Sequence, residues 1–169
     1  LKELDRESET MYSVDLLALR AAKEANIQLI NISRAVRNMA LSQSEQQRDS
    51  IKQSYGGFVD KAREQLKLVN ERVATPEGKR IYKETTNAVE ELLRRQTDGI
   101  ENMGQRTLAE TVSKLVELRS YADKADDLMT DLGGVMANEA SNRNDEMTDI
   151  ANQGFIVSIA VFVAALCLG

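Results

Sequence analysis

Arginine, tyrosine and threonine side chains interrupt the apolar repeat of this chain at points that would lie at a similar height in a bundle of helices. Tyr55, Arg95 and Thr111 fall on positions of a seven-residue repeat that should face the core. A buried guanidinium is costly unless an anion meets it, and its planar fork fits a carboxylate. The pattern therefore predicts a site for a small organic anion, lined by these side chains: Arg34, Arg37, Tyr55, Arg95, Gln96 and Thr111.

The arginine on the core position has a second interpretation. Glu90, Glu91 or Glu110 could neutralise Arg95 as an internal salt bridge, and no ligand would then be needed. The residue types alone do not decide between the two. They also leave open whether the site lies inside one bundle or between two subunits.

Composition excludes several kinds of site. The 169 residues contain no histidine and a single cysteine, which rules out histidine-based triads and the usual zinc, haem and bundle metal sites. Adjacent carboxylates such as Asp126 and Asp127 point apart on a helix and cannot flank a substrate. The net charge of −5, without a basic tract, argues against binding to nucleic acid. We therefore expect no enzyme activity, no cofactor and no metal.

Four helices must position the site. Apolar residues recur every three or four positions over about 5–42, 44–73 and 76–104, and again from Leu108 onward. Ser44 is a suitable cap for the second helix, and Thr75 followed by Pro76 is a strong start signal for the third. Tandem glycines at 56–57 and 133–134 predict close helix approach or a bend. The predicted fold is all-α, an antiparallel up-down-up-down four-helix bundle with long first and last helices.

The C-terminal residues predict a membrane segment. Residues 155–169 carry no charge and one hydroxyl, which is typical of the start of a transmembrane helix of about 20 residues. The preceding segment is acidic, with Arg143 as its only cation, unlike a cytoplasmic flank. We therefore expect a fragment in which residues 1–154 form a domain outside the cytoplasm and 155–169 begin a C-terminal span. A buried core helix is the alternative.

A second apolar face on the first helix predicts self-association. Ile32 and Val36 fix its core side, yet the opposite side also carries large apolar residues. A helix that is apolar on two sides needs two partners, and a second copy of the chain is the simplest. Isolated surface isoleucines are the alternative. The expected interface of a parallel homodimer consists of Ile27, Ile30, Asn31, Arg34, Asn38 and Leu41.

Over nearly its whole length the chain resembles the extracytoplasmic four-helix-bundle sensor domains of bacterial methyl-accepting chemotaxis receptors. The stretch 31–40, NISRAVRNMA, looks like the segment of the aspartate receptor in which arginines follow Asn-Leu-Ser and bind ligand carboxylates across the dimer interface. The break Thr75-Pro76-Glu77-Gly78 and the membrane segment also match. By this alignment Arg34 and Arg37 take the places of two interface arginines, spaced by three rather than four residues, and Leu29 replaces a third.

The resemblance implies a chemoreceptor sensor domain of the bacterial inner membrane, with residues 1–154 in the periplasm. Binding of a di- or tricarboxylate such as malate or citrate, or of an acidic amino acid, would displace the last helix and its span slightly for chemotaxis. Cytoplasmic signalling partners would be reached only through a C-terminal part beyond this chain. Two alternatives stay open: the sensor domain of a membrane histidine kinase, and a tail-anchored structural coiled-coil protein.

Overall fold

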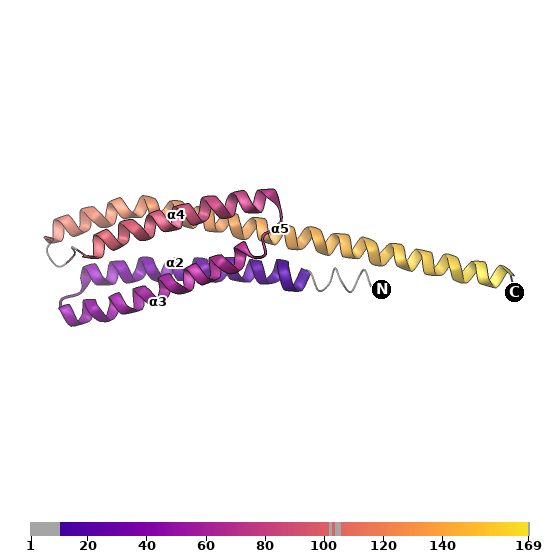
Figure 1. Cartoon of the computed structure of the whole chain (residues 1–169), viewed down its shortest axis with the longest axis horizontal. Coiled ribbons are helices and arrows are strands. Elements are labelled where there is room, and N and C mark those ends of the chain that lie inside the picture. The colour runs from indigo at the N-terminus through magenta and orange to yellow at the C-terminus, as the bar shows by residue number, and fades with distance from the viewer. Residues whose placement is uncertain (1–10, 102, 104–105, 169) are drawn as a thin grey trace.

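The computed structural model describes the backbone of residues 11–101, 103 and 106–168, and the side chains of 14–101, 103 and 106–159. Its helices are the π-helical stretch η1 (Met11–Leu16), α2 (Leu17–Leu41), α3 (Glu45–Asn70), α4 (Pro76–Glu101) and α5 (Leu108–Leu168). The chain pairs α2 with α3 and α4 with α5 as two antiparallel hairpins that lie side by side (Figure 1). The predicted all-α, up-down-up-down four-helix bundle is confirmed.

The predicted start signals of the second and third helices act as expected. The Ser44 hydroxyl accepts a hydrogen bond from the backbone N–H of Gln47 at 3.2 Å, which satisfies one of the free donors at the start of α3. The Thr75 hydroxyl accepts from the N–H of Gly78 at 3.0 Å, and Pro76 is the first residue of α4. The predicted end of this helix, near residue 104, lies outside the described residues, and α4 ends at Glu101.

A capping box starts the last helix, and the sequence reading did not name it. The Thr107 hydroxyl accepts from the N–H of Glu110 at 3.3 Å, and the Glu110 carboxylate accepts from the N–H of Thr107 at 2.8 Å. These bonds stabilise the first turn of α5. The helix begins at the end of the bundle where α2 ends, and it runs back beside α2 and α4 (Figure 1).

The core is built from the predicted apolar seams. Ala18 to Met39 of the first seam are buried, as are most of the seam residues of the other helices. Leu108 is an exception, because it is the first residue of α5 and is 72% exposed at the end of the bundle. The seam of α5 buries these residues: Thr111, Leu118, Ala125, Met129, Leu132, Met136 and Ala140.

The tandem glycines do not mark close helix approach. A Cβ atom added at Gly56, Gly57, Gly133 or Gly134 would meet no atom within 4 Å. Close packing occurs instead at Gly78, where an added Cβ would lie 2.5 Å from Cγ2 of Val73. The prediction of close contact at the glycine pairs is therefore wrong.

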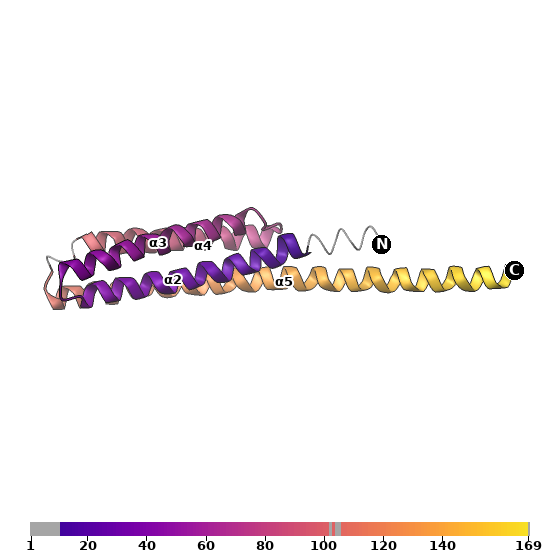
Figure 2. The ribbon, with the colours of Figure 1, turned by 90° about the horizontal axis from the view of Figure 1, so that it is seen from below.

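The last helix continues far past the other helices of the bundle (Figure 2). The predicted membrane segment, residues 155–169, lies mostly outside the described side chains, while its backbone is helical to Leu168 and the side chains of 155–159 are exposed. Within the part of the chain that could be searched, no helix combines the length and the apolar character needed to cross a membrane.

Candidate functional site

A groove of about 690 Å³ between α2, α4 and α5 lies among the predicted site residues. Two of the predicted residues, Arg37 and Gln96, line it. Its remaining walls are mainly apolar and include the buried side chains of Leu29, Val36, Leu92, Leu118 and Ala125. An apolar cavity of this size with a few convergent polar groups is typical of a site for a small molecule.

Gln96 brings a buried polar group to this groove. Its side chain is 2% exposed, and its Oε1 accepts a hydrogen bond from the Tyr55 hydroxyl at 3.5 Å. Within the described part of the chain its Nε2 makes no hydrogen bond. Whichever way the amide is turned, one of its polar atoms is left without a protein partner. The groove therefore offers a directional hydrogen-bonding group in an otherwise apolar floor.

Arg37 supplies positive charge at the mouth of the groove. Its Nε donates to the carbonyl oxygen of Ser33 at 3.3 Å, and it forms no ion pair with any described residue. Across the groove, Arg119 of α5 pairs with Asp123 at 3.6 Å. Their side chains are 81% and 67% exposed, so this pair is weak and easily exchanged for another anion. Asp126 completes the charged rim.

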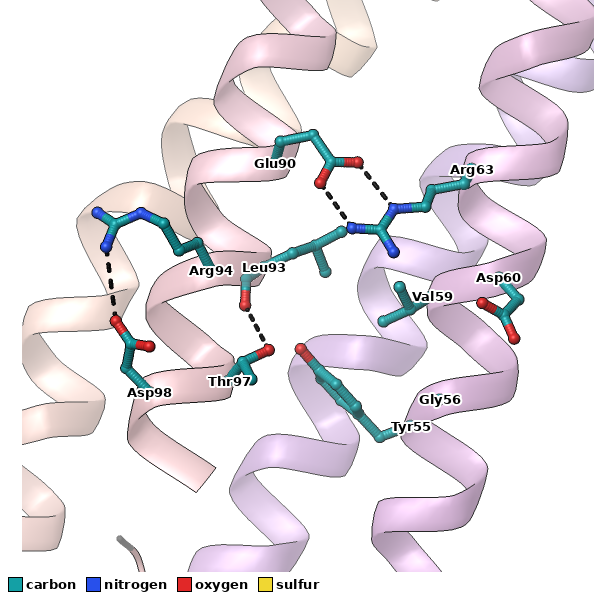
Figure 3. Close-up of a pocket in the computed structure, with 10 residues that line it drawn as sticks. All are labelled: Tyr55, Gly56, Val59, Asp60, Arg63, Glu90, Leu93, Arg94, Thr97 and Asp98. Carbon is teal, nitrogen blue, oxygen red and sulfur yellow. Dashed lines mark hydrogen bonds and ion pairs between the residues drawn. The ribbon is translucent and has the colours of Figure 1, made fainter. Parts of the chain in front are cut away.

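Tyr55 lines a second, smaller cavity of about 310 Å³ between α3 and α4 (Figure 3). Burial raises the pKa of its phenol, an effect that the nearby Thr97 hydroxyl partly offsets, so Tyr55 stays a neutral donor. Because its hydroxyl reaches Gln96, Tyr55 lies between the two cavities. The hydrogen bond from Tyr55 therefore helps to orient the Gln96 amide, and it comes from the side of the smaller cavity.

The cations of the smaller cavity are already neutralised. Arg63 donates to both oxygens of Glu90, at 2.9 and 2.7 Å, which lowers the pKa of the Glu90 carboxyl and raises that of the guanidinium (Figure 3). Arg94 donates to both oxygens of Glu91, at 3.0 and 2.9 Å. This cavity is therefore poorly suited to an anion.

For Arg95 the structure shows the internal salt bridge rather than a vacant cation. Its Nε donates to Glu91 at 2.6 Å and its Nη1 to Glu117 at 3.3 Å, while the guanidinium carbon lies 4.0 Å from the centre of the Tyr121 ring. Hydrogen bonds from Arg94 and Arg95 lower the pKa of Glu91 to about 2. The side chain of Arg95 is 28% exposed, so the expectation of a core arginine is corrected. An anion would reach it only by displacing these carboxylates.

The other two predicted ligand residues line neither cavity. Arg34 is exposed on α2, and Thr111 is buried near the start of α5. Both stay predictions without support from the cavity geometry.

Sequence reasoning missed the rim that α5 contributes. Arg119, Asp123 and Asp126 are spaced by four and three residues, which places them on one stripe of the helix. This stripe runs beside the seam residues Leu118 and Ala125. A polar stripe next to the seam of the helix that faces α2 was the signal that could have revealed the groove.

The predicted self-association face is exposed in the monomer. Its large apolar residues Ile27, Ile30 and Leu41 are all exposed, as are Arg34 and Asn38, while Asn31 is half-buried. Ile30 also lines the groove. The start of α5 adds a stripe of exposed apolar residues: Leu108, Val112 and Val116.

In the part of the chain that could be searched, no group of three or more cysteine, aspartate or glutamate side chains is arranged to hold a metal ion.

Comparison with known proteins identifies a family for the chain. A family model described as a four helix bundle sensory module for signal transduction matches residues 1–151. No curated protein and no solved structure gives a significant match.

Proposed function

This chain belongs to the four-helix-bundle sensory modules for signal transduction, and from this premise we propose that it is the ligand-binding domain of a bacterial chemoreceptor. Such modules are typically periplasmic parts of membrane receptors. In this proposal residues 1–154 face the periplasm, and residues 155–169 begin a span in the inner membrane.

The proposed ligand is a small organic anion that binds in the groove between α2, α4 and α5. One observation carries this proposal: Arg37, which has no ion pair with described residues, and the buried amide of Gln96 line the same apolar groove. Arg37 fits a carboxylate through its fork, and the amide selects for a polar atom at the other end of the ligand. A di- or tricarboxylate, or an acidic amino acid, has this combination of groups. Two or three such contacts, at roughly 1.5 to 3 kcal/mol each, are compatible with micromolar binding.

A ligand in this groove would contact the first and the last long helix at once. The walls come from both α2 and α5, and α5 continues to Leu168. Binding that draws Arg37 and Arg119 toward one anion would change how α5 sits against α2. Helix shifts of about 1 to 2 Å are a recognised switching mode, and α5 would carry such a shift toward the membrane.

Self-association through α2 belongs to the same proposal. Ile30 lies both on the exposed apolar face of α2 and on the wall of the groove. A second copy packed on this face would therefore close one side of the site, so binding and dimerisation should favour each other.

Titration calorimetry of the full chain in detergent tests the site. Malate, citrate, succinate and aspartate form the panel, and we expect micromolar binding of at least one of them. Arg37→Ala should weaken that binding at least tenfold because it removes the cation of the groove. Arg34→Ala is the matched control, since it removes an arginine three residues away that does not line the groove, and it should change affinity less than twofold.

Two results would overturn the proposed site. Equal loss of affinity in both arginine variants would place the ligand on the outer face of α2, between subunits. No binding of any acid by the unaltered chain would remove the anion from the proposal.

A further inference from the structure

An ion pair with a buried carboxylate joins the N-terminal helix, η1 with its continuation α2, to α5 at the end of the bundle opposite the capping box. Asp15 lies in η1, and its residue is 3% exposed. Its Oδ2 accepts a hydrogen bond from Nε of Arg143 at 2.5 Å, across 128 positions of sequence. Among the described side chains, Asp15 is the one charged residue that is buried.

Both charges occupy positions where the pattern calls for apolar residues. Asp15 precedes the buried Ala18 by three residues, and Arg143 follows the buried Ala140 by three. Asp15 therefore occupies a core position, and the guanidinium of Arg143, whose side chain is 27% exposed, reaches it from the edge of the core. A buried pair gives little net stability over apolar packing, but removal of the Arg143 guanidinium leaves the buried Asp15 carboxylate without this compensating charge. In coiled coils, a buried polar residue in the seam can fix how two helices are aligned.

Two further ion pairs between helices, among the described residues, are of a different kind. Arg63 with Glu90 joins α3 to α4, and Arg95 with Glu117 joins α4 to α5. In each of them the carboxylate is well exposed, so water can replace the partner. Within the described residues, Asp15 with Arg143 alone joins the N-terminal helix to α5.

The length of this bond makes it sensitive to the position of α5. Hydrogen bonds weaken steeply beyond about 3.2 Å or when they are poorly aligned. A helix shift of about 1 to 2 Å is enough to lengthen or misalign this one. A shift of this size in α5 would therefore separate the paired arrangement seen here from an unpaired one.

We propose that Asp15 and Arg143 form a lock that holds α5 in one axial position against the N-terminal helix, and that signal transmission opens this lock. The inference rests on the proposed function, in which α5 moves. Both are positioning residues. The nearest groove residue on α2 is Leu29, about 20 Å along the helix from Asp15.

Pulsed electron double resonance on the full chain in lipid nanodiscs tests the lock without any ligand. Cys167 is replaced by serine, and spin labels are attached to cysteines at the exposed positions Lys23 on α2 and Gln153 on α5. These positions lie at different heights of two antiparallel helices, so the distance between the labels follows axial movement of α5. We expect one narrow distance in the otherwise unaltered chain.

Asp15→Asn and Arg143→Gln should each shift this distance by about 1 to 2 Å or add a second population. Exchange of the two charges, Asp15→Arg with Arg143→Asp, should restore the single distance. Arg143→Lys keeps the positive charge and replaces the neutral variants if they do not fold. It should give a mixture of the original and the shifted distance between the labels. The matched control is Arg80→Gln, which removes two exposed ion pairs within α4 and should leave the distance unchanged.

A distance unchanged in the single variants overturns the lock, even if their melting temperature falls, because that result would show a merely structural role. The readout needs no ligand. Failure of the acids to bind the groove would therefore not be confused with failure of the lock.

Discussion

The two exposed glycines Gly57 and Gly134 provide a quantitative test of the helix packing. Neither has a positive φ, and an added Cβ would meet nothing within 4 Å at either position. Alanine is favoured over glycine inside a helix by about 1 kcal/mol, so each Gly→Ala change should stabilise the fold by nearly that amount. The sites lie on different helices and share no contacts, so the double variant should gain about 2 kcal/mol.

Thermal unfolding followed by circular dichroism measures this gain. For a chain of this size, 1 kcal/mol corresponds to about 2 to 4 °C, so the double variant should melt about 4 to 8 °C higher. Gly78→Ala is the matched control, with the same gain in helix propensity. Its new Cβ would lie 2.5 Å from Cγ2 of the buried Val73 and 2.8 Å from Oε1 of Glu139, so this variant should lose stability.

The reasoning fails if Gly57→Ala or Gly134→Ala destabilises the chain while it stays monomeric. That result would mean that the helices approach each other at these glycines, as the sequence first suggested. A loss seen only in the self-associated form would instead place the glycine at the contact between copies.

Three further outcomes are expected. Ile30→Glu should reduce self-association in sedimentation velocity, whereas Lys23→Glu, on the same helix, should not. Arg95→Ala should change ligand affinity less than twofold in calorimetry, because Glu91 and Glu117 already bind its guanidinium. The pKa values of Glu90 and Glu91 are lowered by their arginine partners, that of Glu91 to about 2, so their stabilising effect is present above about pH 4.5 and is lost as the pH falls through the lowered pKa values. In urea titrations at several pH values, Arg63→Gln should therefore lessen the loss of stability in acid; an unchanged acid profile would contradict this assignment.

The fold could be predicted because it follows from the apolar periodicity of the helices and from the capping residues at their ends. Seam residues such as Ile32 and Leu132 are completely buried, and Ser44 and Thr75 cap the helices they precede. The positions of Asp15 and Arg143 could also have been predicted from the sequence. Extending each seam by three residues from Ala18 and Ala140 reaches these two charges, but the acidic segment that contains Arg143 was interpreted only as the flank of the predicted membrane segment.

The site could be predicted only in part because it depends on side-chain reach. A long arginine on a seam position can turn its charged end outward, and Arg95 does so to meet Glu91 and Glu117. Its neighbour Gln96 is buried in its place. The groove itself depends on how far α2 and α5 separate, and the small side chain of Ala125 helps to leave that space. Neither effect follows from counting positions along the chain.

The family match favours sensing over a purely structural anchored coil. A sensory module for signal transduction is compatible with chemotaxis and with kinase output alike.

The side-chain amide signal of Gln96 tests the central claim most directly. In a nitrogen–proton correlation spectrum of glutamine-labelled chain, addition of the acid found by calorimetry should move the Nε2 signal of Gln96 further than any other glutamine signal. A ligand in the groove must meet this amide, because it is the buried hydrogen-bonding group of the floor. An unmoved Gln96 signal at saturating ligand would show that the anion binds elsewhere.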